Sequence, residues 1–181
     1  MKRQITERDI DYAWRAYEFL RKSFSYEWVP ENYSIRLSDI CRNTKQSCDP
    51  LSRLFVGILR SQRVPARTIN CRAAVSAPLS KDPGGGRHTK CEFYAKSIGW
   101  VPIDISTAVS DKQAPAIKHF GYDDGGCITL NIDPDFQLRF DKDISNVRGF
   151  IDSFVWWFGS GSPSSMQDQP SSWKVMATPL K

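Results

Sequence analysis

Three residues of this chain are of the types that together form a nucleophilic catalyst, and they follow one another as Cys48, His88 and Asp104. In such a set the thiolate attacks an acyl carbon, the imidazole takes and returns the proton, and the carboxylate orients the imidazole. Each residue falls on a different predicted element, so the fold must bring the three together. The residue types and their order predict a thiol enzyme that acts on amides or other acyl groups.

Cys48 stands at the start of a strongly amphipathic helical pattern. Apolar residues recur on one side of that pattern at helical spacing, namely Leu51, Leu54, Phe55, Ile58 and Leu59. Pro50 suits the first turn of a helix, and Pro65 ends the helix by about Val64. A helix N-terminus favours a thiolate, and the backbone N–H of Cys48 can donate to an oxyanion. The alternative interpretation is that Cys48 is a small buried hydrophobic residue, as many free cysteines are.

His88 and Asp104 are expected to meet across a β-hairpin. Residues 88–95 and 100–105 have the pattern of strands, and the four residues between them supply the turn. In a hairpin centred near Lys96, opposed residues have numbers that sum to about 192, as His88 and Asp104 do, and a shift by one or two residues makes them diagonal neighbours. Either arrangement allows a hydrogen bond that fixes the imidazole tautomer. The alternative for His88 is a surface or capping role.

Other residues of similar chemistry are expected to stay outside this set. Cys91 points to the opposite face of its strand from His88, which places it in the core. Glu92 shares the face of His88 but lies four residues along the strand, too far for direct contact. His119 has no acidic partner at a suggestive spacing, and it is interpreted as structural.

The order of elements indicates helices first and mostly strands afterwards. A helix is expected at residues 10–24, and Thr6 with Asp9 forms a weak capping box before it. Residues 26–39 look irregular. Strands are expected at residues 67–75, 88–95, 100–105, 127–132, 136–140, 150–158 and 173–177, with loops at 78–87 and, flexible, at 160–172. This order predicts an α+β fold with an antiparallel sheet, in a single domain over residues 1–181.

Composition narrows the classes of function. The net charge is +5 and the pI about 9.0, but the basic residues are dispersed among acidic ones, which disfavours nucleic-acid binding. No apolar stretch approaches the roughly 18 residues that a membrane span needs, and no signal peptide is visible. The five cysteines are an odd number, and no CxxC or Cys–His spacing indicates zinc. No metal or organic cofactor is implied.

Three motifs occur in a specific order and spacing. They are the helix of Cys48 that leads into Val64-Pro65-Ala66-Arg67, then His88 with Glu92-Phe93-Tyr94, and then the segment GWVPIDIS from Gly99 to Ser106. Together they resemble the transglutaminase-like superfamily, and most closely its bacterial members described as candidate cysteine proteases. The resemblance implies a papain-like α+β core in which N-terminal helices pack on an antiparallel sheet. It also implies that Cys48 is the nucleophile, His88 the general base and Asp104 the orienting acid.

The function implied by the resemblance is that of a thiol-dependent amide or acyl hydrolase or acyltransferase, which forms a thioester on a protein or peptide substrate. The alternative is a weakly active or inactive binding module on the same fold. The compartment, either periplasm or cytoplasm, and the oligomeric state stay open. A second oxyanion donor is expected between Tyr26 and Gln46. Trp28 and Trp100 are expected to pack in the interior, and the alternative for both is to line the substrate groove.

The chain departs from the family pattern at a few positions. Gln46-Ser47 stands where relatives usually carry glycine, and Asp49 comes one place before the usual aspartate position, which Pro50 occupies. Arg63 replaces another glycine, and Lys90 replaces a tryptophan that is common two places after the histidine. These changes concern helix capping and the substrate groove more than the three candidate catalytic residues.

Overall fold

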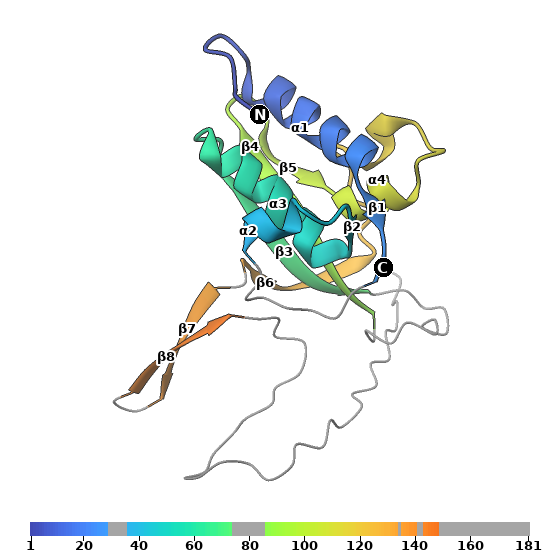
Figure 1. Cartoon of the computed structure of the whole chain (residues 1–181). Helices are drawn as coiled ribbons and strands as arrows, with labels where there is room; N and C mark the ends of the chain where they lie inside the picture. The colour runs from blue at the N-terminus through green and yellow to red at the C-terminus, as the bar shows by residue number, and fades with distance from the viewer. Residues whose placement is uncertain (29–35, 74–85, 134, 141–142, 149–181) are drawn as a thin grey trace, which may run out of the picture.

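The computed structural model describes residues 1–28, 36–73, 86–133, 135–140 and 143–148. Helices come first and strands dominate the later part (Figure 1), which confirms the predicted α+β class. The helices are α1 (Asp9–Ser23), α2 (Leu37–Ile40), α3 (Cys48–Ser61), α4 (Ile105–Ser110) and the 3-10 helix η1 (Ala116–His119). The strands are β1 (Ser25–Tyr26), β2 (Lys45–Gln46), β3 (Ala66–Ala73), β4 (Arg87–Ala95), β5 (Gly99–Ile103), β6 (Cys127–Ile132), β7 (Asp135–Phe140) and β8 (Asp143–Arg148).

One antiparallel sheet with strand order β5-β4-β3-β6 carries the core. The central strands β3 and β4 pair over seven residues, and Cys71 lies opposite His88 in that register. β4 and β5 form the expected hairpin, with Ala95 opposite Gly99 and Cys91 opposite Ile103. Gly99 has φ +100°, a left-handed conformation that glycine adopts without a Cβ clash, and it lets the chain reverse within three residues.

The helices α1, α3 and α4 lie together on one side of this sheet (Figure 1). The apolar stripe of α3 turns toward the sheet, and Leu51, Phe55 and Leu59 are fully buried there. They pack in one core with Phe93 and other apolar residues of β4 and β5. Each such side chain contributes about 1.5–3 kcal/mol when it leaves water, so this stripe fixes α3 on β4.

The C-terminus of α3 has the geometry of a Schellman motif. The Val64 N–H donates to the Leu59 carbonyl at 3.1 Å, and the Arg63 N–H donates to the Arg60 carbonyl at 3.0 Å. Arg63 has φ +62°, in the left-handed region that this position of the motif requires. The helix therefore ends at Ser61, a little before the expected end, and the next residues turn into β3.

Two short pairings complete the described structure. The parallel pair β1–β2 places Ser25 beside Lys45 and Tyr26 beside Gln46, so the chain that leaves α1 runs alongside the residues that precede Cys48. β7 and β8 form a separate antiparallel hairpin, which extends away from the four-stranded sheet in Figure 1. β7 matches the strand expected at residues 136–140, whereas its partner β8 was not expected. The predictions for residues 78–85, 150–158, 160–172 and 173–177 lie outside the described residues.

The start of α1 differs from the prediction. Arg8, not Thr6, is the N-cap residue, and its side chain makes no cap hydrogen bond. Arg8 instead pairs with Asp11 at 2.6 Å, and Asp9 pairs with Arg3 at 2.6 Å. The expected capping box of Thr6 and Asp9 was therefore wrong, because the helix begins at Asp9 and the Asp9 carboxylate is paired with Arg3.

The expected burial of two tryptophans was also wrong, since Trp28 is 51% exposed and Trp100 is 41% exposed. Trp100 lies in β5 next to residues whose side chains face the core, so alternation turns it to the other face. There the Arg67 guanidinium lies 3.9 Å from the centre of its ring. The indole is thus covered by a cation and not by the core.

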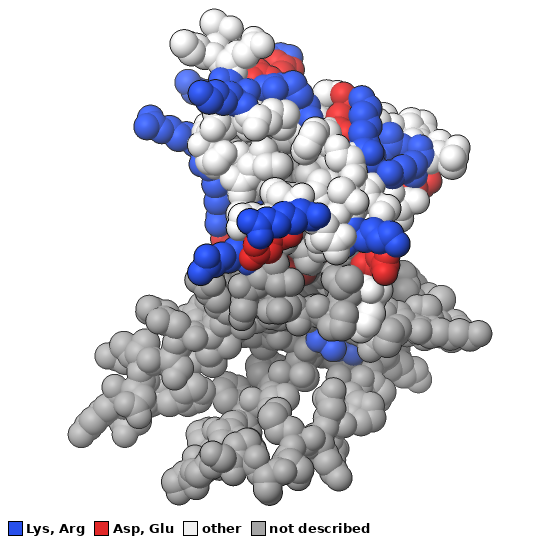
Figure 2. All heavy atoms as spheres, in the orientation of Figure 1, with Lys and Arg blue, Asp and Glu red and all other residues white. Residues whose placement is uncertain are grey.

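Charged side chains form several separate groups on the face shown in Figure 2, and acidic side chains lie beside most of the basic groups. Ion pairs among the described residues include Arg15 with Glu7 at 2.8 Å and Arg60 with Asp133 at 2.7 Å. Within the described ranges, no helix combines the length and the apolar character that crossing a membrane requires.

Candidate active site

His88 and Asp104 are joined by a hydrogen bond. The Nε2 atom of His88 lies 2.8 Å from Oδ2 of Asp104, and both side chains are mostly buried. His88 comes from the second residue of β4, and Asp104 follows the last residue of β5. The sheet therefore brings together two residues that are 16 positions apart in the chain.

The Asp104 carboxylate is held by several donors. Its Oδ1 atom accepts from the Ser106 hydroxyl and from the Thr107 N–H, both at 2.9 Å. Its Oδ2 atom accepts from the Thr107 hydroxyl at 2.8 Å, in addition to its bond with His88. Asp104 is thus the N-cap of α4, and the first turn of that helix fixes the orientation of its carboxylate.

The pair is strongly polarised. Burial works to lower the pKa of His88, but hydrogen bonds and charge interactions with Asp104 and Cys48 outweigh it and raise the pKa to about 10. Burial works to raise the pKa of Asp104, but His88 and Thr107 hold it well below its usual range. At neutral pH the arrangement is therefore a carboxylate that faces an imidazolium.

Cys48 is the first residue of α3 and is partly exposed. Its sulfur lies near enough to His88 to contribute to the raised pKa of the imidazole. α3 is anchored beside β4 by the buried Ser52 hydroxyl, which donates to the Thr89 carbonyl at 2.9 Å. This bond links the turn that follows Cys48 to the residue that follows His88. All three predicted residues are thus brought to one place.

Asp49, the acidic neighbour of Cys48, is buried with 2% of its surface exposed. It does not cap α3, because the N-cap is Ser47 and makes no side-chain cap bond. Its Oδ2 atom instead lies 3.5 Å from Nη1 of Arg53, one turn along the helix. The arginine charge offsets the repulsion between the Asp49 carboxylate and a thiolate at the neighbouring Cys48.

The hairpin register differs by two residues from direct opposition of His88 and Asp104, so the second of the two expected arrangements, with the two as diagonal neighbours, is the one observed. The ladder pairs Cys91 with Ile103 and ends there, so Asp104 lies beyond the ladder and does not face His88 directly. The turn reverses over residues 96–98 and not around Lys96 alone, which produces this shift. Because side chains alternate with a period of two, a shift of two leaves every residue on its expected face. The carboxylate still reaches His88, as a diagonal neighbour.

The other candidates behave as expected except for one. Cys91 is 1% exposed and belongs to the core, and Glu92 pairs with Arg67, not with His88. His119, for which the sequence spacing suggested no acidic partner, has one in the structure, since its Nε2 atom lies 3.4 Å from Oδ2 of Asp111. The loop between α4 and η1 brings Asp111 back to His119, which the sequence spacing did not suggest.

Sequence reasoning missed the residues that support the site. Ser106 and Thr107 hold Asp104, and Ser52 anchors α3 to β4. One signal was present, because an aspartate followed three places later by threonine is typical of a helix N-cap. Ser52 gave no such signal, since its partner is a backbone carbonyl on a distant strand.

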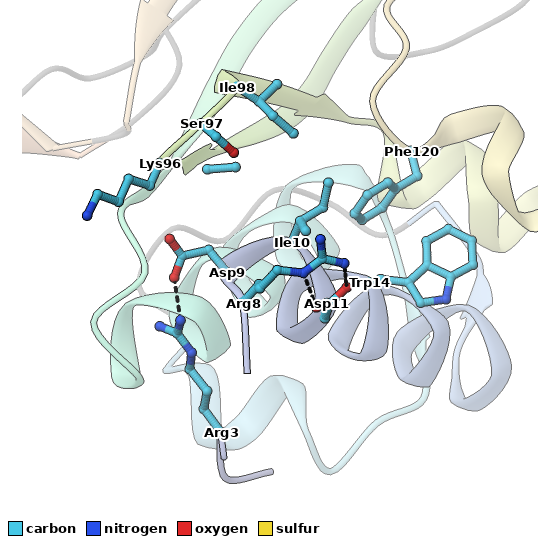
Figure 3. A pocket seen from close by; sticks show the side chains of 11 residues that line it. Arg3, Arg8, Asp9, Ile10, Asp11, Trp14, Lys96, Ser97, Ile98 and Phe120 are labelled. Atoms are coloured by element: carbon cyan, nitrogen blue, oxygen red, sulfur yellow. Dashed lines mark hydrogen bonds and ion pairs between the residues drawn. The ribbon is translucent and has the colours of Figure 1, made fainter. Parts of the chain in front are cut away.

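A pocket among the described residues lies away from this site. It has a volume of about 550 Å³ and is formed between the N-terminal part of α1 and the turn of the β4–β5 hairpin (Figure 3). Trp14, Ile98 and Phe120 supply apolar walls, and the arginines at its rim are paired with Asp9 and Asp11. None of the three site residues lines it. Within the described part of the chain, no group of three or more His, Cys, Asp or Glu residues is placed to hold a metal ion.

Residues 1–105 match the family model of the transglutaminase-like superfamily. The chain belongs to this superfamily. The match ends one residue after Asp104, so it spans α1, α3 and the β3–β5 part of the sheet. An uncharacterised protein of Haemophilus influenzae is 25% identical over 134 residues, which cover 59% of this chain and 36% of that protein. The chain thus spans about a third of the length of this relative.

Solved structures with low sequence identity are similar over part of the chain. A candidate cysteine protease from Cytophaga hutchinsonii shares 13% identity and a TM-score of 0.44, over 81% of this chain and 48% of the other. A transglutaminase shares 15% identity and a TM-score of 0.44, over 61% of this chain and 29% of the transglutaminase chain. The periplasmic domain of TgpA from Pseudomonas aeruginosa shares 16% identity and a TM-score of 0.39, over 61% of this chain and 49% of the TgpA chain.

Proposed function

We propose that this chain is a thiol-dependent acyl enzyme that cleaves or transfers amide-linked acyl groups of a protein or peptide substrate. Cys48 is the nucleophile, His88 carries the proton and Asp104 orients His88. The observation that carries the proposal is the fixed pair of His88 and Asp104, 2.8 Å apart, beside the cysteine that begins α3. Membership of the transglutaminase-like superfamily supports the same chemistry.

The first step is attack on the substrate carbonyl. The Cys48 sulfur forms a bond to the carbonyl carbon, and the electron pair of the C=O bond moves to oxygen. The oxyanion accepts from the Cys48 N–H at the start of α3, where backbone donors are unpaired. A second donor comes from the segment around β1, which the β1–β2 pairing places beside the residues before Cys48.

The later steps use the proton on His88. The imidazolium donates it to the leaving amine, the C–N bond breaks and a thioester forms on Cys48. Water or an amine then attacks the thioester carbon, and His88 accepts the proton of the attacking group. The C–S bond breaks, the acyl product leaves, and the Cys48 thiolate is regenerated beside the protonated His88. Asp104 stabilises the charged imidazole in both steps and, held by α4, keeps its ring in position.

Selective alkylation tests the mechanism without a known substrate. Iodoacetamide applied below pH 8 is expected to modify Cys48 faster than the exposed Cys41, because a neighbouring imidazolium favours the reactive thiolate. His88→Ala is expected to slow the labelling of Cys48 by about tenfold or more and to leave Cys41 unchanged. Peptide mass spectrometry reads both sites in one sample.

Equal rates at Cys48 and Cys41, or an unchanged Cys48 rate in His88→Ala, would contradict the proposal and leave the inactive binding module as the better reading. If Cys48 passes this test, incubation with a glutamine-containing protein and a fluorescent amine shows whether water or an amine accepts the acyl group. Incorporation of the amine indicates transfer, whereas release of product without incorporation indicates hydrolysis. Cys48→Ala should abolish both, and Cys41→Ser is the matched control.

A further inference from the structure

Two further cysteines lie beside the candidate active site and have no part in the proposed reaction. Cys71 in β3 is opposite His88, and Cys127 is the first residue of the neighbouring strand β6. β3 and β6 pair Cys71 with Thr129, so Cys127 is two residues away on the same face, as a diagonal neighbour. This register places the two side chains on one face of the sheet, near enough for each thiol to shift the pKa of the other. Both are reduced in this structure.

The two thiols differ in accessibility and charge. Cys71 is fully buried, whereas Cys127 is partly exposed. Interaction with Cys127 and burial raise the pKa of Cys71 well above its ordinary value. Interaction with Cys71 lowers the pKa of Cys127 to about 7 against the effect of burial, and the charges of His88 and Lys90 add to the lowering. This is the asymmetry of a reactive thiol with a protected partner.

Lys90 strengthens the setting of Cys127. It lies two residues after His88 on the same face of β4, and its ammonium is 3.1 Å from Asp123 and 3.3 Å from Asp124. These ion pairs hold the loop that leads into β6 against β4, so the start of β6 stays near His88. The lysine that replaces the usual tryptophan of the family thus lies next to the thiol pair.

We propose that Cys71 and Cys127 form a reversible oxidation site, at which a peroxide converts the two thiols into a disulfide between β3 and β6. Cys127, the partly exposed thiol, is the attacking residue, and Cys71, its buried neighbour, is the resolving residue. The position beside His88 couples the oxidation state to the environment of the imidazole. This proposal does not depend on the proposed acyl chemistry, because its test measures the oxidation state of Cys71 and Cys127 and not the enzymatic activity.

The oxidation proceeds in two steps. The Cys127 thiolate attacks one oxygen of hydrogen peroxide, the O–O bond breaks, and Cys127 sulfenic acid and hydroxide are formed. The Cys71 sulfur then bonds to the Cys127 sulfur, the S–O bond breaks, and the oxygen leaves as water with the proton of the Cys71 thiol. Overall, two thiols are oxidised by two electrons and one peroxide is reduced to two waters.

The strand that carries Cys127 can make the required adjustment. A disulfide needs a sulfur–sulfur separation of about 2.04 Å, so the two thiols must approach. Among the described strands, β6 lies at an edge of the sheet and pairs with β3 alone, and it follows Gly125 and Gly126. Gly125 has φ +70°, a conformation that strains other residues. These glycines let the first residue of β6 shift while the rest of the ladder stays paired.

The experiment uses the full chain with Cys48→Ala, which removes the competing nucleophile. After brief treatment with hydrogen peroxide and trypsin, we expect residues 68–72 and 119–139 to appear as one disulfide-linked peptide that dithiothreitol separates. Cys127 should react roughly ten times faster than Cys41, because a thiol with a pKa near 7 is about half ionised at neutral pH and an ordinary thiol only about 3%. Cys127→Ser should abolish the link and Cys41→Ser should not affect it.

Three outcomes would overturn the proposal. The first is that Cys71 and Cys127 stay separately alkylatable after Cys41 has been oxidised. The second is that Cys127 proceeds to sulfinic acid without a link, and the third is that it links to Cys41 or, in the wild-type chain, to Cys48. The decisive peptide is read in a chain that keeps both thiols, so poor folding of Cys127→Ser does not affect the result. Far-UV circular dichroism checks that variant, and Cys127→Ala repeats it.

Discussion

At the scale of residues, the site depends on how one carboxylate is held. Asp104 has four donors from three residues, and three of these donors belong to the first turn of α4. A carboxylate with all its acceptor positions used has one orientation, so the His88 ring that contacts it has one orientation as well. The charge on His88 is therefore built into the folded state, and it has a consequence for stability.

The pH dependence of stability should report this charge. The folded pKa of His88, about 10, lies above its ordinary value of 6.5, so folding favours the protonated form. Its contribution is complete below pH 6.5 and is lost as the pH rises toward 10, with a slope of up to about 1.4 kcal/mol per pH unit. Urea unfolding at several pH values should show a steeper decline for the wild type than for His88→Gln. Parallel curves between pH 7 and 10 would contradict the shift.

At the scale of elements, the contact between α3 and β4 sets the position of Cys48 relative to His88. Apolar packing supplies most of the free energy that holds α3 on β4. It constrains rotation and sliding of the helix less than a directional hydrogen bond does. The bond from the Ser52 hydroxyl to the Thr89 carbonyl is directional and fully buried. It defines the helix register at the turn that carries the cysteine.

Ser52→Ala tests this anchor. Loss of the hydroxyl leaves the buried Thr89 carbonyl without that donor, which should lower the free energy of unfolding by about 1–2 kcal/mol. Labelling of Cys48 by iodoacetamide should slow as well. Ser61→Ala is the matched control, because its hydroxyl bonds at the exposed end of the same helix, to Ile58 at 2.7 Å, and the change should stay within about 0.5 kcal/mol. Equal losses in the two variants would count against the anchor.

The Schellman motif at the end of α3 gives a stabilising prediction. Arg63 adopts φ +62° and its side chain is exposed, so glycine should relieve the left-handed strain without loss of packing. Arg63→Gly is expected to raise the free energy of unfolding by about 0.5–1 kcal/mol in urea titrations. Gln62→Gly, one residue earlier at φ −112°, is the contrasting control and should be destabilising by a similar amount. A destabilised Arg63→Gly would mean that the arginine side chain makes a contribution of its own.

The sequence predicted most of the elements that carry the site, and the reasons for the failures are physical. The stripe from Leu51 to Leu59 and the alternation from His88 to Ala95 are local patterns, so α3, β4 and the faces of their residues followed from them. The two-residue shift in the hairpin and the position of Asp104 after β5 depend on turn geometry. The Ser52 anchor depends on a long-range backbone contact, which a local pattern does not contain.

At the scale of the whole molecule, a cluster of aromatic side chains joins α1 to β4 and to the segment that follows η1. Phe120 contacts the rings of Trp14 at 5.0 Å, Tyr17 at 5.3 Å and Phe93 at 5.8 Å, measured between ring centroids. The Tyr17 hydroxyl also donates to the Ala116 carbonyl at 2.6 Å. α1, β4 and the segment after η1 are thus packed as one unit, although they are far apart in the sequence.

Phe120→Ala should therefore affect the whole fold. Removal of this buried ring should lower the free energy of unfolding by about 3–5 kcal/mol, because a large cavity would form between α1 and β4. Phe19→Ala is the matched control, since Phe19 lies on α1 with 51% of its surface exposed and should change stability by about 0.5 kcal/mol or less. Differential scanning calorimetry compares the two. A loss below about 1 kcal/mol for Phe120→Ala would show that the cluster is not central to the fold.

The edge formed by β5 has a consequence for association between molecules. An exposed edge strand presents unpaired N–H and C=O groups on which another chain can build a sheet, and this is a route to aggregation. In β5, Pro102 has no N–H, and its carbonyl accepts a hydrogen bond from the Gly121 N–H at 2.8 Å. The Asp104 N–H donates to the backbone carbonyl of His119 at 3.2 Å. The short bridge between Ile103 and Phe120 continues this cover. At the end of β5 that leads to Asp104, these backbone groups are therefore not available for strand pairing with another molecule.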